Sequence, residues 1–326
     1  MSLAVVTGGA GFIGNHLVRG LLAAEHRVVI IDNFSTGRRG NILDLLVRHR
    51  DRLRLEEGSV TDPVFVRRVV RGADIVFHLA AVPSVQKSVE HPDISNEHNI
   101  TGTLNVLLAA RDGGVRRVIY AASSSAYGDT PTLPKTEDMP PEPLSPYALT
   151  KLAGEQYCRI FTRIYGLETI ALRYFNVFGP RQEPTSHYAA VVPRFITRML
   201  RDEPPIVYGD GNQSRDFTFV DNVVRANLLA VRAPVEATGR VFNIACGERL
   251  DLNALVAALN RILGKDLPPR FQDFRPGDVM HSLADITLAG QLLGYSPIIP
   301  LEKGLAITVD WYRNNENRTP ATETPS

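Results

Sequence analysis

Short apolar runs alternate with helical patterns through the first half of the chain. The first run, Leu3 to Val6, predicts a strand, and the segment NHLVRGLLAA that follows it has the apolar period of a helix. A second apolar run, RVVIID, ends at Asp32 and predicts another strand. The chain therefore begins with a strand, a turn, a helix and a second strand.

The same alternation continues to about residue 179. Further strands are predicted in RLRLEEGSV, ADIVFHLAA, VRRVIYAASSS and ETIALRYFNVFGP, with helices near Pro63–Val70, about Pro92–Asp112 and Tyr147–Tyr165. Repeated strand–helix units with buried-looking strands are typical of a parallel sheet with helices on both faces. We therefore expect an α/β fold built on a Rossmann-like, doubly wound parallel sheet.

The order of elements changes after Gly179. The segment to Arg215 is rich in predicted loops, while GRVFNIA (Gly239–Ala245) predicts a strand that returns to the main sheet. Asp251 is the expected N-cap of a helix in DLNALVAALNRILG. These patterns predict a first unit over 1–179, a smaller C-terminal lobe interleaved over 180–312, and a disordered polar tail over 313–326.

Composition narrows the class of protein. The chain has 326 residues, 44% hydrophobic content and a formal net charge of +1, so it can bury a large core and has no strong field for nucleic acid or membrane. Its two cysteines do not form a metal-ligand pattern, and we expect them to be free thiols of a cytoplasmic protein that holds no metal. The apolar start is too short for a transmembrane span.

The turn after the first strand predicts the cofactor. Gly8, Gly11 and Gly14 follow the strand at the spacing GxxGxxG and lead into the helix. Such a turn lets the backbone approach a pyrophosphate, which the helix N-terminus then holds. Asp32 ends the second strand 18 residues after Gly14, where an acid can bind both hydroxyls of the adenosine ribose. The pattern predicts a dinucleotide site that favours NAD over NADP.

A second constellation predicts proton transfer. Tyr147 and Lys151 lie four residues apart, on one face of a predicted helix, and a lysine ammonium there lowers the pKa of the neighbouring phenol. The lysine can also hold a ribose hydroxyl. Ser123, Ser124 and Ser125 end a predicted parallel strand, where ligands bind in the crevice. We expect Tyr147 to act as a base near neutral pH.

Together these motifs resemble the extended short-chain dehydrogenases/reductases, and most closely the NAD-dependent nucleotide-sugar 4-epimerases. The resemblance runs from Leu3 to about Trp311 and is carried by TGGAGFIG, DNFSTG, HLAA, NITGTLNVL, SSSAYG, YALTK, RYFNVFGPRQ, GDGNQSRDF and RPGDV. It implies that the smaller C-terminal lobe binds the substrate. It also implies a homodimer formed by two helices from each chain, with Leu104, Leu107, Leu108, Phe161 and Ile164 as candidate interface positions.

The resemblance also implies a role for each matching position. Ser123, Tyr147 and Lys151 would be catalytic. The cofactor would contact Gly8, Gly11, Phe12, Ile13, Gly14, Asp32, Asn33, Ser35, Thr36, Gly37, Ser59, Val60, Leu79, Ala80, Ala81, Asn99 and Phe175, as well as Tyr147 and Lys151. A UDP-sugar would contact Ser84, Ser123, Ser124, Ser125, Asn176, Ala190, Val191, Tyr208, Arg215, Arg275, Asp278 and Ser282. Two arginines suit the diphosphate because they pair with phosphates in forked geometry.

Three positions refine the expected substrate. Ser59 stands where many relatives carry an acid near the adenine, and Pro83 stands where some galactose-pathway epimerases carry a lysine. The small Ser282 matches a position beside the hexose and leaves room for an N-acetyl group. The resemblance therefore implies C4 epimerisation of UDP-GlcNAc and UDP-GalNAc through a 4-keto intermediate, with UDP-Glc and UDP-Gal also accepted.

Two alternatives stay open. The first is a UDP-glucuronate 4-epimerase, which no residue of this sequence argues against. A 4,6-dehydratase is disfavoured, because it needs an Asp-Glu pair where Ser124 and Ser125 stand. A regulatory protein that binds NAD without catalysis would also fit the glycine turn. The presence of Ser123, Tyr147 and Lys151 argues against that second alternative.

Overall fold

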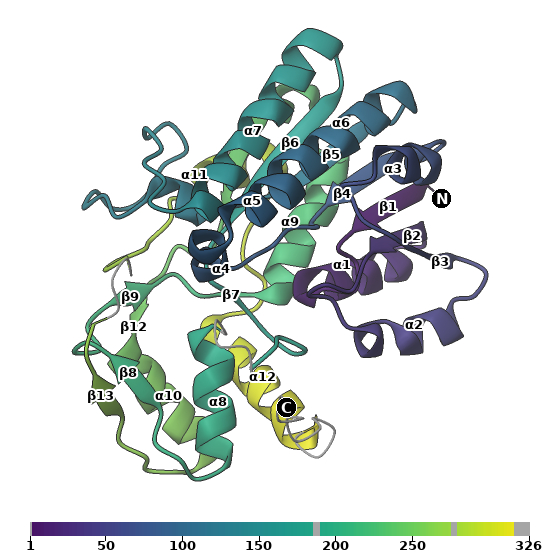
Figure 1. Ribbon diagram of the computed structural model, residues 1–326. Helices are drawn as coiled ribbons and strands as arrows, with labels where there is room; N and C mark the ends of the chain where they lie inside the picture. The colour runs from purple at the N-terminus through teal and green to yellow at the C-terminus, as the bar shows by residue number, and fades with distance from the viewer. Residues whose placement is uncertain (1, 185–189, 275–278, 316–326) are drawn as a thin grey trace.

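Seven parallel strands form the centre of the computed structural model, which describes residues 2–184, 190–274 and 279–315. Within those residues the strands of the large sheet lie in the order β11-β6-β5-β4-β1-β2-β3 (Figure 1). Their bounds are β1 (Leu3–Thr7), β2 (Arg27–Asp32), β3 (Leu53–Glu57), β4 (Ile75–His78), β5 (Arg117–Ser123), β6 (Glu168–Tyr174) and β11 (Arg240–Ile244). The strand expected at 239–245 is thus β11, which pairs in parallel with β6.

Helices cover both faces of this sheet. One face carries α1 (Phe12–Ala23), α2 (Leu43–Arg48), α9 (Val220–Arg232) and α11 (Thr287–Leu293), which share one apolar cluster with the sheet. The other face carries α3 (Pro63–Val70), α6 (Gly102–Asp112) and α7 (Pro146–Tyr165), with a second cluster. The sheet is therefore the doubly wound Rossmann-like sheet that the sequence predicts, and its strand order reverses between β1 and β4, where such folds bind ligands.

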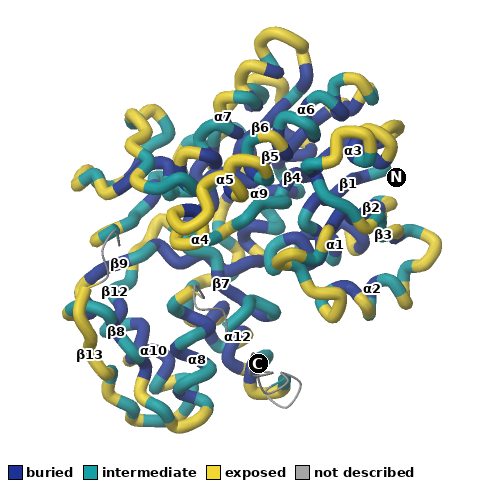
Figure 2. Tube along the Cα trace, viewed as in Figure 1, coloured by how far each residue is buried: buried dark blue, intermediate teal, exposed yellow. Residues whose placement is uncertain are grey.

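A smaller lobe lies beside the carboxyl ends of the strands (Figure 1). Its apolar core joins α8 (Val191–Leu200), α10 (Leu252–Leu263) and α12 (Leu301–Asn315), with dark-blue buried segments inside the lobe in Figure 2. Asp251 caps α10 by accepting from the N–H of Ala254 at 2.7 Å, as expected. Short strand pairs complete the lobe: β7 (Val177–Phe178) with β10 (Thr218–Phe219), β9 (Ser214–Arg215) with β12 (Leu250–Asp251), and β8 (Ile206–Tyr208) with β13 (Arg270–Gln272).

Four features differ from the predicted elements. The segment expected to be loop-rich contains α8, whose buried positions have helical spacing. Pro193 made this segment look non-helical in the sequence, although proline is tolerated in a first helical turn. α9 and α11 belong to the large sheet rather than to the smaller lobe. The long helix expected over 92–112 is divided into α5 (Pro92–Asn96), the π-helical turn η2 (Glu97–Thr101) and α6. Residues 313–315, expected in the tail, end α12, and 316–326 lie outside the described residues.

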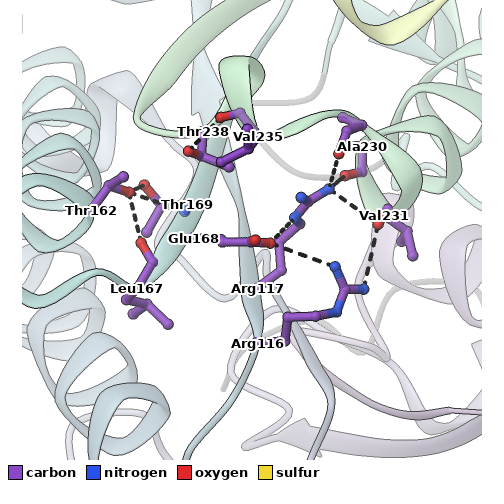
Figure 3. A network of polar contacts seen from close by, with 11 residues as sticks. Arg116, Arg117, Thr162, Leu167, Glu168, Thr169, Ala230, Val231, Val235 and Thr238 are labelled. Carbon is purple, nitrogen blue, oxygen red and sulfur yellow. Dashed lines mark hydrogen bonds and ion pairs between the residues drawn. The ribbon is translucent and has the colours of Figure 1, made fainter.

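The remaining short elements border the site or the connections. They are η1 (Arg39–Asn41), α4 (Val85–Glu90), η3 (Ser124–Tyr127) and η4 (Val235–Ala237). A buried arginine fixes the C-terminal end of α9: Arg117 donates from Nη1 to the carbonyls of Ala230, Val231 and Ala233, at 2.7, 3.1 and 2.9 Å (Figure 3). Since the last carbonyls of a helix lack internal partners, this cation caps α9.

Candidate active site

The glycine turn has no side chains that cover the backbone where α1 begins. Gly8 has a φ of +70°, and a Cβ at Gly8 would lie 2.8 Å from the N atom of Ala80. A Cβ at Gly14 would lie 2.0 Å from the carbonyl oxygen of Gly8. The N-cap of α1, Gly11, has no side chain to bond the first N–H groups of the helix. These groups are therefore open to a phosphate, as a dinucleotide requires.

Asp32 is buried at the end of β2 and is held in a fixed orientation. Its Oδ2 accepts from the N–H of Ala10, and its Oδ1 accepts from the N–H of Phe34, both at 2.8 Å. Burial raises the pKa of Asp32, whereas the two N–H donors lower it. A carboxylate fixed beside the glycine turn can accept from ribose hydroxyls and would repel an additional phosphate there.

A cavity of about 690 Å³ joins these groups to the Tyr147–Lys151 pair. Most of the expected cofactor residues lie on its wall, together with two residues expected to contact the sugar. These wall residues are Gly8, Gly11, Phe12, Ile13, Gly14, Asp32, Asn33, Ser35, Thr36, Gly37, Ser59, Val60, Leu79, Ala80, Ala81, Tyr147, Lys151, Ser84 and Ala190. Residues from Gly8 to Ala190 in the sequence thus line one continuous cavity.

Two expected cofactor residues, Asn99 and Phe175, lie behind the cavity wall instead of on it. Both are buried, with 1% and 0% of their surface exposed. The Asn99 side chain accepts from the N–H of Val82 at 2.8 Å and donates to Thr150 Oγ1 at 3.0 Å. Asn99 thus ties the loop after β4 to α7 and supports the cavity wall from behind.

The expected catalytic residues meet at the ends of β5 and α7. Lys151 is buried, and its Nζ donates to the carbonyl of Ala121 at 2.8 Å. The Ser123 hydroxyl interacts with the phenol of Tyr147 and accepts from Ser125 Oγ at 2.8 Å. The Tyr147 phenol and the Lys151 ammonium therefore lie on the cavity wall, and the Ser123 hydroxyl contacts the phenol from behind that wall. A phenol, a hydroxyl and an ammonium are the groups that proton transfer from a sugar hydroxyl needs.

Burial has the largest effect on the pKa values of Tyr147 and Lys151. Burial raises the pKa of Tyr147 above its usual value, and the opposing influence is the hydrogen bond with Ser123, not the charge of Lys151. Burial lowers the pKa of Lys151 to about 8, while Glu155 and Cys158 raise it. The Lys151 ammonium donates to the Ala121 carbonyl, so the expected lowering of the phenol's pKa by Lys151 stays a prediction.

Residues expected to contact the sugar nucleotide are distributed over several segments. Asn176, in the left-handed region at φ +32°, donates from Nδ2 to Ser282 Oγ at 3.0 Å. Arg215 on β9 donates to the carbonyl of Met280 at 3.1 Å. Ser123, Ser124, Ser125, Asn176, Val191, Tyr208, Arg215 and Ser282 do not line the cavity, and Arg275 and Asp278 lie outside the described residues.

Sequence reasoning missed several polar residues of the cavity wall, which are Arg38, Lys87, His98, Gln182 and Glu183. Lys87 lies on α4, whose N-cap Ser84 accepts from the Lys87 N–H at 3.1 Å. Its position three residues after Ser84, which the resemblance marks as a sugar contact, was the available signal. Within the described residues no ion pair neutralises the Lys87 side chain, so this part of the wall is positively charged.

Other chemistries lack support in the part of the chain that the structure describes. There, no group of His, Cys, Asp or Glu side chains is arranged to hold a metal ion. Both cysteines are free thiols. None of the helices in the described ranges has the length and apolar character needed to cross a membrane.

The sheet and the cavity define a dinucleotide-binding protein with a tyrosine–lysine pair on the wall of a Rossmann-like site. The chain belongs to the NAD dependent epimerase/dehydratase family, whose model matches residues 4–245. NAD is its cofactor, in agreement with the bare glycine turn and the oriented Asp32.

Similar proteins agree with this assignment over nearly the whole chain. A putative UDP-glucose 4-epimerase of Methanocaldococcus jannaschii is 37% identical over 97% of this chain and 99% of its own. A UDP-N-acetylglucosamine 4-epimerase from Methanobrevibacter ruminantium, solved with UDP-N-acetylmuramic acid, is 38% identical with a TM-score of 0.91, covering 96% and 99% of the two chains. A UDP-glucuronic acid 4-epimerase from Bacillus cereus, solved with UDP-glucuronic acid and NAD, is 34% identical with a TM-score of 0.89 and the same coverage.

Proposed function

We propose that this protein is a UDP-sugar 4-epimerase that inverts C4 through a 4-keto sugar. The observation that carries the proposal is that Tyr147 and Lys151 line the same cavity as the glycine turn and Asp32. Relatives with UDP-glucose, UDP-N-acetylglucosamine and UDP-glucuronate 4-epimerase names support this reaction type. NAD bound in the cavity supplies the hydride acceptor for C4 and then the hydride donor to its opposite face.

The chain's own groups move and hold the proton. Tyr147 receives the proton of the sugar 4-hydroxyl as C4 is oxidised, and it returns the proton when C4 is reduced. Ser123 donates to the phenolate oxygen and so offsets part of the burial that disfavours it. Lys151, fixed by Ala121, keeps a donor at the cavity wall for a ribose hydroxyl.

The substrate that we propose first is the acetylated pair, UDP-GlcNAc and UDP-GalNAc, with UDP-Glc and UDP-Gal as further substrates. Ser282 is small, and Asn176 Nδ2 orients its hydroxyl at 3.0 Å. A small residue beside the hexose leaves space for the 2-acetamido group. Ser84, on the cavity wall, contributes a short hydroxyl that allows a sugar to turn between the two hydride transfers.

One observation favours UDP-glucuronate as the second candidate. The exposed Lys87 ammonium lies on the cavity wall near Ser84 and Tyr147, and it could pair with a sugar carboxylate. A cation in this position gives an uncharged hexose no comparable interaction. The two candidates therefore differ in whether activity depends on Lys87.

The test is a panel of UDP-GlcNAc, UDP-Glc and UDP-glucuronate, each incubated with the protein and separated by chromatography. We expect each 4-epimer pair of the neutral sugars to reach the same equilibrium from both sides. Activity confined to UDP-glucuronate and lost in Lys87→Gln would establish the second candidate. Binding of NAD with turnover of none of these sugars would instead identify a non-catalytic protein.

We also propose a homodimer formed through the outer face of α7. Leu107 and Phe161, two positions expected at the interface, are buried in the chain's own core, so they are excluded from it. Leu149, Ile160 and Ile164 are instead 53, 44 and 65% exposed on α7. Light scattering should give twice the chain mass for the parent protein, and a mass near the monomer for Ile164→Glu; a monomeric parent would contradict the proposal.

The cytoplasm is the compartment that we propose, because both thiols are free and a reducing compartment keeps them so. Cell fractionation followed by immunodetection should recover the protein with the cytoplasmic fraction. Recovery outside that fraction would exclude this location.

A further inference from the structure

Asp216 is fully buried at the centre of the substrate-side loops. Its Oδ1 accepts from the N–H of Cys246 at 2.9 Å, and its Oδ2 accepts from the N–H groups of Gly247 and Ala284 at 3.0 and 3.2 Å. Its own carbonyl accepts from Asn176 Nδ2 at 3.1 Å. One side chain and its backbone therefore bond to three segments that are distant in sequence.

Two of these segments, and the segment of Asp216 itself, carry a residue that the resemblance assigns to the UDP-sugar. Arg215 precedes Asp216 directly, and Ser282 lies two residues before Ala284. The N–H of Ser282 donates to the carbonyl of Ser214 at 3.0 Å, and its hydroxyl accepts from Asn176. The relative positions of Asn176, Arg215 and Ser282 thus depend on contacts that converge on Asp216.

We propose that Asp216 is a positioning residue, which must be a carboxylate to hold Asn176, Arg215 and Ser282 in the arrangement that binds the UDP-sugar. Both carboxylate oxygens accept here, so either protonation or an amide would turn a donor toward a backbone N–H. A buried N–H that loses its acceptor is unfavourable, and the loops would then separate. The proposal rests on the proposed function for the identity of the ligand.

The surroundings of Asp216 make its charge sensitive to pH near neutrality. Burial raises the pKa of Asp216 to about 6, the Glu248 carboxylate raises it further, and the three N–H donors lower it. The other titratable groups that face it are the Cys246 thiol and the Tyr295 phenol, whose own pKa values are raised by burial and by the Asp216 charge. Asp216 is therefore charged above about pH 6, and it takes up a proton as the pH falls through that value.

The experiment measures the affinity of UDP-glucose by calorimetry from about pH 5 to about pH 8, with NAD bound. UDP-glucose is suitable because its phosphates are diesters and keep their charge across this range. We expect the Kd to rise roughly tenfold toward pH 5 with a midpoint near 6, as Asp216 is protonated. NAD affinity should change less than about twofold, since Asp216 is absent from the wall of the cofactor cavity.

Two variants separate positioning from a general structural role. Asp216→Asn should raise the Kd roughly tenfold or more at every pH and remove the midpoint near 6. Glu248→Gln, at an exposed position outside the proposed binding residues, should keep the parent's affinity at about pH 8 and move the midpoint to lower pH, because it removes the nearby negative charge.

The outcomes also separate this inference from the proposed function. If the parent binds UDP-glucose with no dependence on pH, or if Asp216→Asn binds as the parent does, the positioning role is overturned while the epimerase proposal stands. If Asp216→Asn does not fold, the pH dependence of the parent and the shift in Glu248→Gln decide the matter. If the parent binds no UDP-glucose, the proposed function and the positioning role both fail.

Discussion

The backbone N–H of Tyr147 donates a 3.0 Å hydrogen bond to the hydroxyl of Ser88. Ser88 is fully buried on α4, and its hydroxyl donates onward to the carbonyl of Val85 at 2.5 Å. Tyr147 is the second residue of α7, where N–H groups have no partner within the helix. Ser88 thus anchors the end of the helix that carries the proposed base.

Ser88→Ala should weaken this anchor. The substitution leaves a partly buried N–H without an acceptor, so we expect a loss of about 1 kcal/mol in the free energy of unfolding and a fall in kcat. Ser95→Ala is the matched control, because Ser95 is equally buried on α5 and its hydroxyl has no hydrogen-bond partner among the described residues. Denaturant unfolding and turnover are measured for both variants. Equal stability and turnover of the two would show that the bond to Tyr147 contributes nothing.

Tyr147→Phe removes the proton acceptor and keeps the ring. We expect turnover to fall by roughly a hundredfold or more, as for loss of a positioned base, with NAD retained. Tyr157→Phe on the same helix is the control, since Tyr157 is absent from the cavity wall. Initial rates and the NAD content of purified protein check the prediction, and near-normal turnover in Tyr147→Phe would refute the mechanism.

Alkaline pH should reduce activity through Lys151. Burial lowers its pKa to about 8, so the ammonium is present below that pH and is lost as the pH rises through it. We expect kcat/KM to fall on the alkaline side with a midpoint near 8. Glu155→Gln should lower that midpoint, because the Glu155 charge raises the pKa of Lys151. A rate profile that stays flat well above pH 8 in the parent would contradict this role for the ammonium.

Gly14→Ala should abolish NAD binding. Its Cβ would lie 2.0 Å from the carbonyl oxygen of Gly8, which forces the glycine turn away from α1. Gly40→Ala is the control, because a Cβ there meets nothing within 4 Å. NAD affinity by calorimetry and thermal unfolding of both variants check the prediction, and parental NAD affinity in Gly14→Ala would show that the turn tolerates a side chain.

Ser282→Tyr should fill the space that we assign to the acetamido group. We expect turnover of UDP-GlcNAc and UDP-GalNAc to fall by at least about tenfold relative to UDP-Glc and UDP-Gal, because steric exclusion acts against the larger substrate. Asn176→Ala provides a comparison, since it removes the hydrogen bond to Ser282 without adding bulk. Rates on both sugar pairs check the prediction; equal losses on the two pairs would mean that Ser282 does not control substrate size.

Local patterns in the sequence determined most of the fold and the cofactor half of the site. Strand and helix periods, the glycine spacing and the acid at the end of β2 are all properties of short segments, and parallel strands bring their carboxyl ends to one edge. For this reason Gly8, Asp32, Tyr147 and Lys151 could be placed in one cavity before the structure was known. The sequence did not predict α8 because Pro193 interrupts its helical pattern, although the first turn of a helix tolerates proline.

Only the tertiary structure decided which groups face one another and how strongly burial acts on them. The bonds from Cys246, Gly247 and Ala284 to Asp216 span up to 68 residues, and nothing in the local pattern specifies them. Likewise the spacing of Tyr147 and Lys151 is a helical property, but the direction of the Lys151 ammonium toward Ala121 is not. Desolvation and long-range hydrogen bonds depend on packing between distant segments, whereas periodicity and turn chemistry depend on neighbours along the chain.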